Sequence, residues 1–564
     1  MRKTESSDLW WKNAVVYCLD VETFFDSDDD GTGDFDGVSA RIDHLAELGV
    51  TCLWLMPFYP TAERDDGYDI TDFLAVDPKL GNFGDLVELI RTAKDRGMRV
   101  IADLVVNHTS DKHPWFREAR KSTDNPYRDF YVWRDTEPPD TSGQVVFPDQ
   151  EDSLWELDEK TGQWYLHNFY KHQPDLNVTN PQVRDEISKV IGFWMQLGLD
   201  GFRVDAVPNL IEGRGTSAAA SAEYGDPHDY LRRIKAFMGR RRGDAILLGE
   251  VNIPYEKQVD FFGGQNSGDE LTMQFDFELM QRMYLALARQ EAAPIAKTLA
   301  RRPDLPRHNQ FACFVRNHDE LTLDKLSDKE RQEVFDAFGP EPDMQLFGRG
   351  LRRRLPPMLD GDPRRIRMVY SLLFALPGTP VLFYGEEIGM GENLDVEGRL
   401  AVRTPMQWTS GKNAGFSRAR PSRLPSPITE GAFGPQHVNV SEQRKDPGSL
   451  LSFISNLAGR YRESPEVGMG TFEVLQHEAP SVLAHRCTWA QPGDPGTSTL
   501  LVHNLGPEAT EITVEVADLE EGTVANELFS TEHLVVDDGR LTIPVDGYGH
   551  QWWRLHRPGD TRLP

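Results

Sequence analysis

Short apolar, β-branched runs recur along most of the chain, with amphipathic helical stretches between them. Strands that alternate with helices in this way predict a parallel sheet of the α/β class. Eight such runs predict a closed (β/α)8 TIM barrel, and they lack the glycine fingerprint of the competing open Rossmann sheet. The runs are AVVYCLDV (14–21), CLWLMP (52–57), RVIADLVVNH (99–108), GFRVDAV (201–207), AILLGEV (245–251), TMQFDF (272–277), FACFVRNH (311–318) and PVLFYGEE (380–387).

One helix between these runs has a clear apolar face. In VSARIDHLAELG (38–49), apolar residues recur at helical spacing and Gly49 supplies a stop signal. We therefore expect one continuous helix that packs this face against the barrel and ends at Gly49. The apolar face consists of Val38, Ile42, Leu45 and Leu48.

Two stretches break the alternation of strands and helices. Residues 107–178 are too long for a βα loop and are rich in Trp, Tyr, Pro and Asp, which predicts an inserted subdomain, domain B. From residue 470 onward the pattern becomes alternating and punctuated by turns, which predicts a C-terminal β-sandwich over 470–564. The barrel is then formed by residues 1–106 and 179–469.

The charge of the chain limits its partners. A formal net charge of −29 at pH 7 argues against a nucleic-acid partner, because binding to phosphates needs clustered Lys and Arg. A small neutral ligand fits this charge better. The most basic runs, GRRRGD (239–244) and LRRRL (351–355), are expected to be solvated faces of helices.

The start of the chain, MRKTESSDLWWKN, lacks the apolar region of a signal peptide, and no run approaches the roughly 18 apolar residues of a membrane span. We therefore expect a cytoplasmic protein without a membrane segment. The cysteines lie far apart in apolar runs, so we expect buried thiols and no disulfides. They are Cys18, Cys52, Cys313 and Cys487.

The stretch FFDSDDDGTGDF (24–35) concentrates acidic side chains around a glycine-containing turn. Alternate carboxylates and one carbonyl would supply the oxygen ligands that calcium prefers, and Gly31 at position 6 of the loop permits a sharp bend. Position 12, where an EF-hand has Glu, is Gly37, so we expect a strand–loop–helix calcium unit rather than an EF-hand. A solvated acidic turn is the alternative. The ligands expected at positions 1, 3, 5, 7 and 9 are Asp26, Asp28, Asp30, Thr32 and Asp34.

Three carboxylates close strand-like runs: Asp205, Glu250 and Asp319. In a barrel the catalytic side chains project from the carboxyl ends of the strands, so these three are expected to meet. Two carboxylates about 5 Å apart suit retaining glycoside hydrolysis, and a third can stabilise the transition state. Taken singly, each is more often a loop anchor or a helix cap. His108 and His318, which end the third and seventh runs, are expected on the same rim.

The two reacting carboxylates need different environments, because the nucleophile has to be ionised while the acid holds a proton near neutrality. Arg203 precedes Asp205 by two residues on a strand, so both side chains point the same way and the guanidinium is expected to keep Asp205 ionised. Glu250 has no adjacent cation in the sequence, and an apolar setting would raise its pKa. Glu250 therefore fits the role of proton donor.

Four strings, DLVVNH, GFRVDAV, LLGEV and VRNHD, resemble the four signature regions of the α-amylase superfamily, glycoside hydrolase family thirteen. The resemblance covers nearly the whole chain and implies a barrel with an inserted domain B, a C-terminal sandwich and a retaining mechanism on α-glucosidic bonds. It implies Asp205 as nucleophile, Glu250 as general acid/base and Asp319 as transition-state stabiliser. It also implies that the sugar at the cleavage site is held by His108, Arg203 and His318.

Further strings extend the resemblance to the glucose pocket and to metal sites. RDDGYDI and VRTPMQW are similar to motifs that close the pocket from behind, here through Asp65, Tyr68 and Arg403. An Asp–Arg pair that grips the non-reducing hydroxyls favours short α-glucosides over starch. DSDDDGTGD resembles the first-loop calcium site of oligo-1,6-glucosidases and trehalose synthases, which implies a structural calcium ion, with magnesium as the alternative. A second calcium site would use Asn107, Asp175 and Glu212.

Long strings such as HNFYKHQPDLN and LPGTPVLFYGEEIGMGEN are similar to trehalose synthases, which implies interconversion of maltose and trehalose in a closed pocket, without an organic cofactor. The loops IEGRGTSAAASAEYGDPHDYL and EVNIPY differ from the expected strings. A hydrolytic α-glucosidase, or a transglucosylase, on maltose-like or sucrose-like disaccharides is therefore the alternative. A non-catalytic binding relative is a remote one, because all three carboxylates are present. Relatives are often dimeric, which suggests a homodimer.

Overall fold

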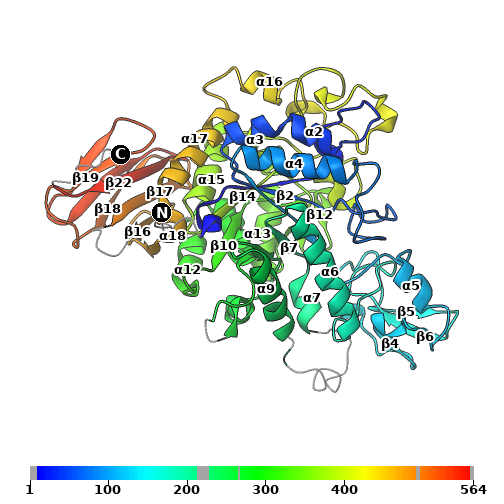
Figure 1. The fold of residues 1–564 in the computed structure, drawn as a ribbon. Coiled ribbons are helices and arrows are strands. Elements are labelled where there is room, and N and C mark those ends of the chain that lie inside the picture. Colours follow the sequence, from blue (N-terminus) through cyan, green and yellow to red (C-terminus); the bar gives the residue numbers. More distant parts are fainter. Residues whose placement is uncertain (1–8, 213–225, 227, 265–266, 491–495, 559–564) are drawn as a thin grey trace.

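The computed structural model describes residues 9–212, 226, 228–264, 267–490 and 496–558 (Figure 1). Its centre is a closed parallel barrel with the strand order β1-β14-β10-β9-β8-β7-β3-β2. All eight runs that the sequence singles out form these strands, so the predicted barrel is confirmed. The strands are β1 (Val16–Leu19), β2 (Cys52–Leu55), β3 (Arg99–Leu104), β7 (Gly201–Val204), β8 (Ile246–Gly249), β9 (Met273–Phe275), β10 (Gln310–Phe314) and β14 (Thr379–Phe383).

Helices surround the barrel (Figure 1). α4 (Phe83–Asp95) shows how the sequence encodes them, because Asn82 and Asp85 form a capping box at its start and its buried residues recur at helical spacing from Leu86 to Ala93. Such helices bury an apolar stripe against the barrel and leave the opposite face polar. Others are α6 (Pro181–Leu197), α9 (Asp229–Arg241), α11 (Phe277–Arg289), α12 (Ala293–Arg301), α13 (Asp328–Phe338), α15 (Pro363–Ala375) and α17 (Leu450–Glu463).

The single helix expected before Gly49 is in fact two helices, α2 (Phe35–Ala40) and α3 (Ile42–Leu48), so the prediction of one continuous helix is wrong. The break falls at Arg41, whose guanidinium carbon lies 3.9 Å from the centroid of the Phe25 ring. The expected apolar face is nonetheless buried. Gly49 ends α3 in the left-handed region at φ 94°, which glycine adopts without strain.

The segment between β3 and α6 carries a small sheet of its own beside the barrel, with the strand order β4-β6-β5 (Figure 1). Aromatic side chains pack against one another in this segment, and Phe116 stacks on Trp133 with ring centroids 5.7 Å apart. The Leu176 N–H donates to the Asn107 carbonyl at 2.9 Å, so the segment leaves and rejoins the barrel at one rim. Its elements are α5 (Pro114–Ala119), β4 (Trp133–Arg134), β5 (Trp155–Asp158) and β6 (Gln163–Leu166).

The C-terminal residues form two antiparallel sheets around a hydrophobic core of their own. The Trp552 indole N–H donates to Ser371 Oγ of α15 at 3.1 Å, which ties this region to a barrel helix. One sheet consists of β15 (Thr471–Val474), β16 (Val482–Trp489), β17 (Thr497–Asn504), β22 (His550–His556), β19 (Val524–Glu527) and β20 (His533–Val535), and the other of β18 (Thr510–Glu515) and β21 (Arg540–Val545).

All four cysteines lie within the described residues, where they are buried free thiols. They sit on β1, β2, β10 and β16, so they serve as apolar packing residues of strands. Among the helices of the described ranges, none combines the length and the apolar character that crossing a bilayer requires.

Candidate active site

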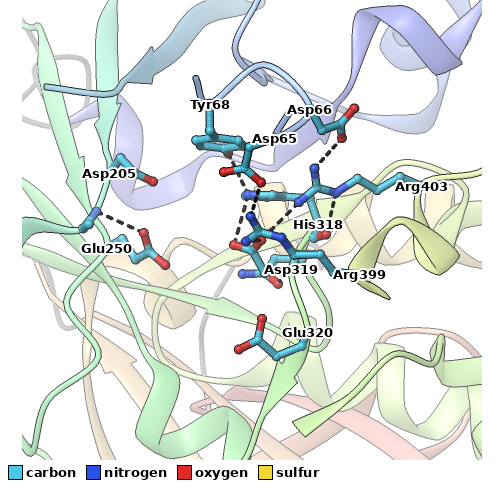
Figure 2. Close-up of polar contacts among 12 residues, drawn as sticks. Asp65, Asp66, Tyr68, Asp205, Glu250, His318, Asp319, Glu320, Arg399 and Arg403 are labelled. Carbon is cyan, nitrogen blue, oxygen red and sulfur yellow. Dashed lines mark hydrogen bonds and ion pairs between the residues drawn. The ribbon is translucent and has the colours of Figure 1, made fainter. Parts of the chain in front are cut away.

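The three carboxylates that follow barrel strands face one cavity (Figure 2). Asp205 follows β7, Glu250 follows β8 and Asp319 lies beyond β10. The cavity has a volume of about 330 Å³, and its lining also includes Asp65 and Tyr68. The structure therefore brings together acids that are far apart in the chain, as the barrel topology requires.

Arg203 bridges two of these carboxylates beneath the cavity. Its Nη1 donates to Asp205 Oδ1 at 2.7 Å, and its Nη2 donates to Glu250 Oε2 at 2.7 Å. The guanidinium is buried and also contacts Asp103 at 2.5 Å. Glu250, which has no adjacent cation in the sequence, therefore has one in the structure. The cation comes from the neighbouring strand, since Val204 of β7 is in register with Gly249 of β8.

Burial and ion pairing give the three acids different proton affinities. Burial raises the pKa of Glu250 to about 7, against the attraction of Arg203. Burial also raises the pKa of Asp205 to about 6, so Arg203 keeps this group ionised only above that pH. Burial alone would raise the pKa of Asp319 as well, but His318 and two arginines hold it well below its ordinary value.

Two arginines from the loop after β14 face Asp319 (Figure 2). Arg399 donates to Asp319 Oδ1 and to Asp65 Oδ1, both at 2.6 Å. Arg403 donates to Asp319 Oδ1 at 3.1 Å and pairs with Asp66. Asp65 therefore pairs with Arg399, and the motif arginine Arg403 pairs with the neighbouring aspartate. The sequence did not single out Arg399 and Asp66. A signal was present, because GRLAVR contains Arg399 as well as Arg403, and RDDG contains Asp66 as well as Asp65.

The remaining predicted sugar-binding residues are Tyr68, His108 and His318. All three are buried, and Tyr68 and His108 line the cavity. The Tyr68 hydroxyl and His318 Nε2 are 2.7 Å apart, and the two rings stack with their centroids 5.6 Å apart. His108 Nε2 lies 3.1 Å from the Tyr68 carbonyl oxygen. His318 Nε2 is also 3.2 Å from Asp319 Oδ2, so these rings continue the hydrogen-bond network of the carboxylates.

The run LRRRL is not a solvated helix face, so that expectation is wrong. Arg352 Nη1 donates to the Val396 carbonyl at 2.7 Å, and Arg354 Nη2 donates to the Val402 carbonyl at 2.6 Å. Both arginines are buried because their planar groups satisfy carbonyl oxygens of the loop that carries Arg399. The other basic run, GRRRGD, lies at the exposed end of α9, as expected.

The acidic loop groups three of its five predicted metal ligands. Carboxylate oxygens of Asp26, Asp28 and Asp34 lie within 4.8 Å of one another, and an all-oxygen donor set of this kind suits a hard cation. Within the described residues, Asp30 stands outside this group of carboxylates, and the Thr32 carbonyl stays a predicted ligand. The loop is preorganised, since Asp26 accepts hydrogen bonds from the backbone N–H groups of residues 28, 29 and 31.

The predicted second metal site is only partly described. Asn107 and Asp175 are both buried, and they lie on neighbouring backbones joined by the bridge between His108 and Asp175. The Asp175 carboxylate accepts a hydrogen bond from the Asn168 N–H at 3.0 Å, and burial raises its pKa to about 7. The side chain of Glu212, at the end of α7 (Val207–Glu212), lies outside the described residues.

Comparison with known families matches most of the barrel to one of them. A family model described as "Alpha amylase, catalytic domain" matches residues 20–335 and 353–468. The matched region includes all three carboxylates, Arg203 and the loop with Arg399 and Arg403. The model does not match residues 336–352, which include the turn after β12 (Gln345–Leu346).

Individual proteins match over nearly the full length. The trehalose synthase/amylase TreS of Mycobacterium tuberculosis (strain ATCC 25618 / H37Rv) is 42% identical over 97% of this chain and 90% of that protein. The trehalose synthase of Pimelobacter sp. (strain R48) is 40% identical over 98% and 97% of the two chains. A crystal structure of the trehalulose synthase MutB, 27% identical, superposes with a TM-score of 0.74 over 97% of this chain and 100% of that one.

Proposed function

Since the chain belongs to the alpha-amylase family, we propose that it interconverts maltose and trehalose through a covalent glucosyl intermediate. Two trehalose synthases that are 42% and 40% identical over nearly the whole chain support this substrate pair. The observation that carries the chemistry is the set of three carboxylates, Asp205 buried and Glu250 and Asp319 partly buried, with three different proton affinities around one cavity of about 330 Å³.

In the first step, the Asp205 carboxylate attacks the anomeric carbon of the bound glucosyl unit, and the glycosidic bond breaks. Glu250, whose pKa burial raises to about 7, gives its proton to the leaving oxygen. The products are a glucosyl–Asp205 ester and one free glucose. Asp319 stays ionised, because Arg399 and Arg403 contact it, and it stabilises the positive charge that develops on the sugar ring.

In the second step, the free glucose turns within the cavity and attacks the ester with its anomeric hydroxyl. Glu250, now ionised, accepts the hydroxyl proton, and the Asp205 carboxylate leaves. Water that reached the ester would give glucose in place of trehalose, so exclusion of water determines the product. We assign the grip on the glucosyl unit to Asp65, Tyr68, His108, Arg203, His318 and Arg403. In support, Asp65, Tyr68 and His108 line the cavity, and Arg203, His318 and Arg403 contact residues that line it.

We also propose that the acidic loop holds a structural calcium ion, with magnesium as the alternative. Asp26, Asp28 and Asp34 would bind it directly, and Asp30 and Thr32 lie on the same loop. The ion would neutralise carboxylates that repel one another and would take no part in the chemistry. A second ion at Asn107, Asp175 and Glu212, the homodimer and the cytoplasmic location stay predictions from the sequence.

The alternative function is hydrolysis of maltose-like substrates. The printed name of the M. tuberculosis relative, trehalose synthase/amylase, keeps it open, as do the two loops that differ in sequence beside Asp205 and Glu250. The test is to incubate the protein with maltose and to quantify trehalose and free glucose, with Glu250→Gln as the blank. We expect trehalose as the main product. Glucose without trehalose would establish the hydrolase and overturn the isomerase.

A further inference from the structure

Two segments from different parts of the chain meet beside the cavity through one aromatic contact. Phe147 ends the lid segment, which we define as residues 142–147, and Phe347 lies in the hairpin formed by β12 (Gln345–Leu346) and β13 (Gly350–Leu351). Their ring centroids are 5.1 Å apart. The Phe147 ring also stacks on Tyr170, with centroids 4.5 Å apart, so the contact is part of a packed aromatic cluster.

The hairpin turn holds Phe347 in an unfavourable backbone conformation. The Arg349 N–H donates to the Leu346 carbonyl at 3.3 Å, and the two central residues have positive φ, 56° at Phe347 and 64° at Gly348. Turns of this kind strongly prefer Asn, Asp or Gly at the first central position, because a bulky side chain is disfavoured there. A ring held at such a position, against Phe147, indicates a function for the contact.

The same cluster touches the charged groups around Asp319. The Arg349 guanidinium lies 5.3 Å from the centroid of the Phe347 ring and donates to Glu320 at 3.2 Å. The Arg399 guanidinium lies 5.2 Å from the centroid of the Phe147 ring. Phe147, Glu320, Arg349 and Arg399 all line the cavity, and Phe347 contacts two of these lining residues, Phe147 and Arg349.

We propose that the contact between Phe147 and Phe347 determines reaction specificity, because it retains the released glucose and excludes water from the glucosyl–Asp205 ester. The proposal rests on the proposed function. Attack by glucose or by water breaks the same ester bond, and in both cases Glu250 takes the proton and the Asp205 carboxylate leaves. The two outcomes differ only in the nucleophile. Access to the cavity therefore determines the ratio of trehalose to glucose.

The test compares variants of Phe347 in the full-length protein. Phe347→Asn removes the ring and suits the turn, Phe347→Tyr keeps the ring, and Phe83→Ala removes an exposed aromatic residue of α4, remote from the cavity. From maltose, we expect Phe347→Asn to raise the ratio of free glucose to trehalose roughly two- to tenfold, the range that one aromatic contact is worth. The two control variants should keep the wild-type ratio.

A second measurement uses isotopically labelled glucose added to the solution. The label should enter trehalose more readily in Phe347→Asn than in the wild type, because the free glucose exchanges with solvent; a loss of fold stability alone would not raise this incorporation. Phe147→Ala should have the same effect, and the double variant should add little to it. An unchanged ratio and unchanged incorporation in Phe347→Asn, in a protein that makes trehalose, would overturn the proposal. A wild type that makes only glucose would instead overturn the proposed function.

Discussion

At the scale of single residues, Arg203 couples the two candidate reacting groups. Its guanidinium contacts Asp205 and Glu250 at the same distance, 2.7 Å, so a proton gained or lost by one carboxylate changes the field at the other. Asp319 is separate from this pair, because its arginines come from the loop after β14. The ionisation of the pair therefore determines the pH range in which the site can work.

We expect kcat/KM to follow a bell-shaped pH profile with limbs near pH 6 and pH 7. Asp205, with its pKa raised to about 6, has to be ionised to attack, so activity falls as the pH drops through 6. Glu250, with its pKa raised to about 7, has to be protonated, so activity falls as the pH rises through 7. The two apparent values belong to the coupled pair.

The assignment of the alkaline limb is checked with α-glucosyl fluoride, whose leaving group departs without a proton. When formation of the glucosyl enzyme is measured with this substrate, the limb should be absent in the wild type and in Glu250→Gln alike. Glu320→Gln, which changes another carboxyl group of the cavity, should keep the alkaline limb with maltose. An alkaline limb that persists in Glu250→Gln would show that another group is the acid.

Asp205→Asn tests the nucleophile. The variant removes the attacking oxygen but keeps the shape of the side chain, so we expect kcat to fall by about 10⁴-fold or more while the protein stays folded. Turnover of maltose and the thermal unfolding midpoint are the two measurements. Substantial turnover in a pure preparation would remove Asp205 from the role of nucleophile.

At the scale of elements, the acidic loop and α2 form one unit. The Asp34 carboxylate accepts a hydrogen bond from the Gly37 N–H and thereby caps α2, while the Asp26 N–H donates to the Phe416 carbonyl at 3.1 Å. The loop therefore fixes both the start of a barrel helix and the segment that follows Arg403. A bound cation would stabilise both contacts.

Removal of calcium with a chelator should lower the unfolding midpoint. A cation present at about 100 times its Kd stabilises the folded state by about 3 kcal/mol. Asp28→Asn, which removes a charge from the ligand group, should abolish most of the chelator effect, whereas Asp30→Asn, at an exposed position outside the group, should reduce it less. Equal midpoints with calcium and with chelator would argue for a solvated acidic turn.

The sequence predicts elements well where one local pattern determines them. All eight barrel strands coincide with apolar runs with recognisable ends, with β10 and β14 starting one residue earlier, and the TIM barrel follows from their number. The break at Arg41 was not predictable, because apolar periodicity continues through it and the aromatic ring that Arg41 contacts lies in a different element. The prediction that LRRRL is a solvated helix face was wrong for a similar reason. The arginines of this run donate to carbonyl groups more than forty residues further along the chain.

At the scale of the whole molecule, two buried histidines, His485 and His503, and the half-buried His550 lie where the C-terminal sheet meets the barrel. His485 Nε2 is 2.9 Å from the Ala375 carbonyl, and His503 Nε2 is 3.0 Å from Ser371 Oγ, both on α15. His550 is the cross-strand partner of His503. Burial lowers the pKa of His485 and of His550 to about 4, and that of His503 further.

We expect stability to fall as the pH drops from about 6.5 toward 4. In the unfolded chain the histidines gain a proton below their ordinary pKa of 6.5. In the folded protein the pKa of His485 and of His550 is lowered to about 4, so they gain a proton only near that pH. For His485 the loss at pH 5 is about 2 kcal/mol. The measurement is the unfolding midpoint at pH 7 and pH 5. His485→Gln should make the change smaller, and His437→Gln, at an exposed position, should leave it unaltered.

The site was predictable in part. Strand ends identify Asp205, Glu250 and Asp319, because the topology of a barrel brings such residues together whatever their separation in the chain. The contact of Arg203 with Glu250 could not be predicted. It depends on the lateral register of β7 and β8, which leaves no signal in the sequence near either residue. The pairing of Asp65 with Arg399 likewise depends on how an irregular loop folds back over the cavity.

Closure of the barrel through β1 and β14 has a consequence for biosynthesis. Val16 of β1 pairs with Val381 of β14. β1 leaves the ribosome early, but it can pair with β14 only after residue 381 has emerged. At roughly 5–20 residues per second, the delay is about 20 to 70 s. During that time the nascent chain presents an unpaired, apolar sheet edge, which is a template for aggregation. Recombinant yield should therefore improve when translation is followed closely by chaperones that shield such edges.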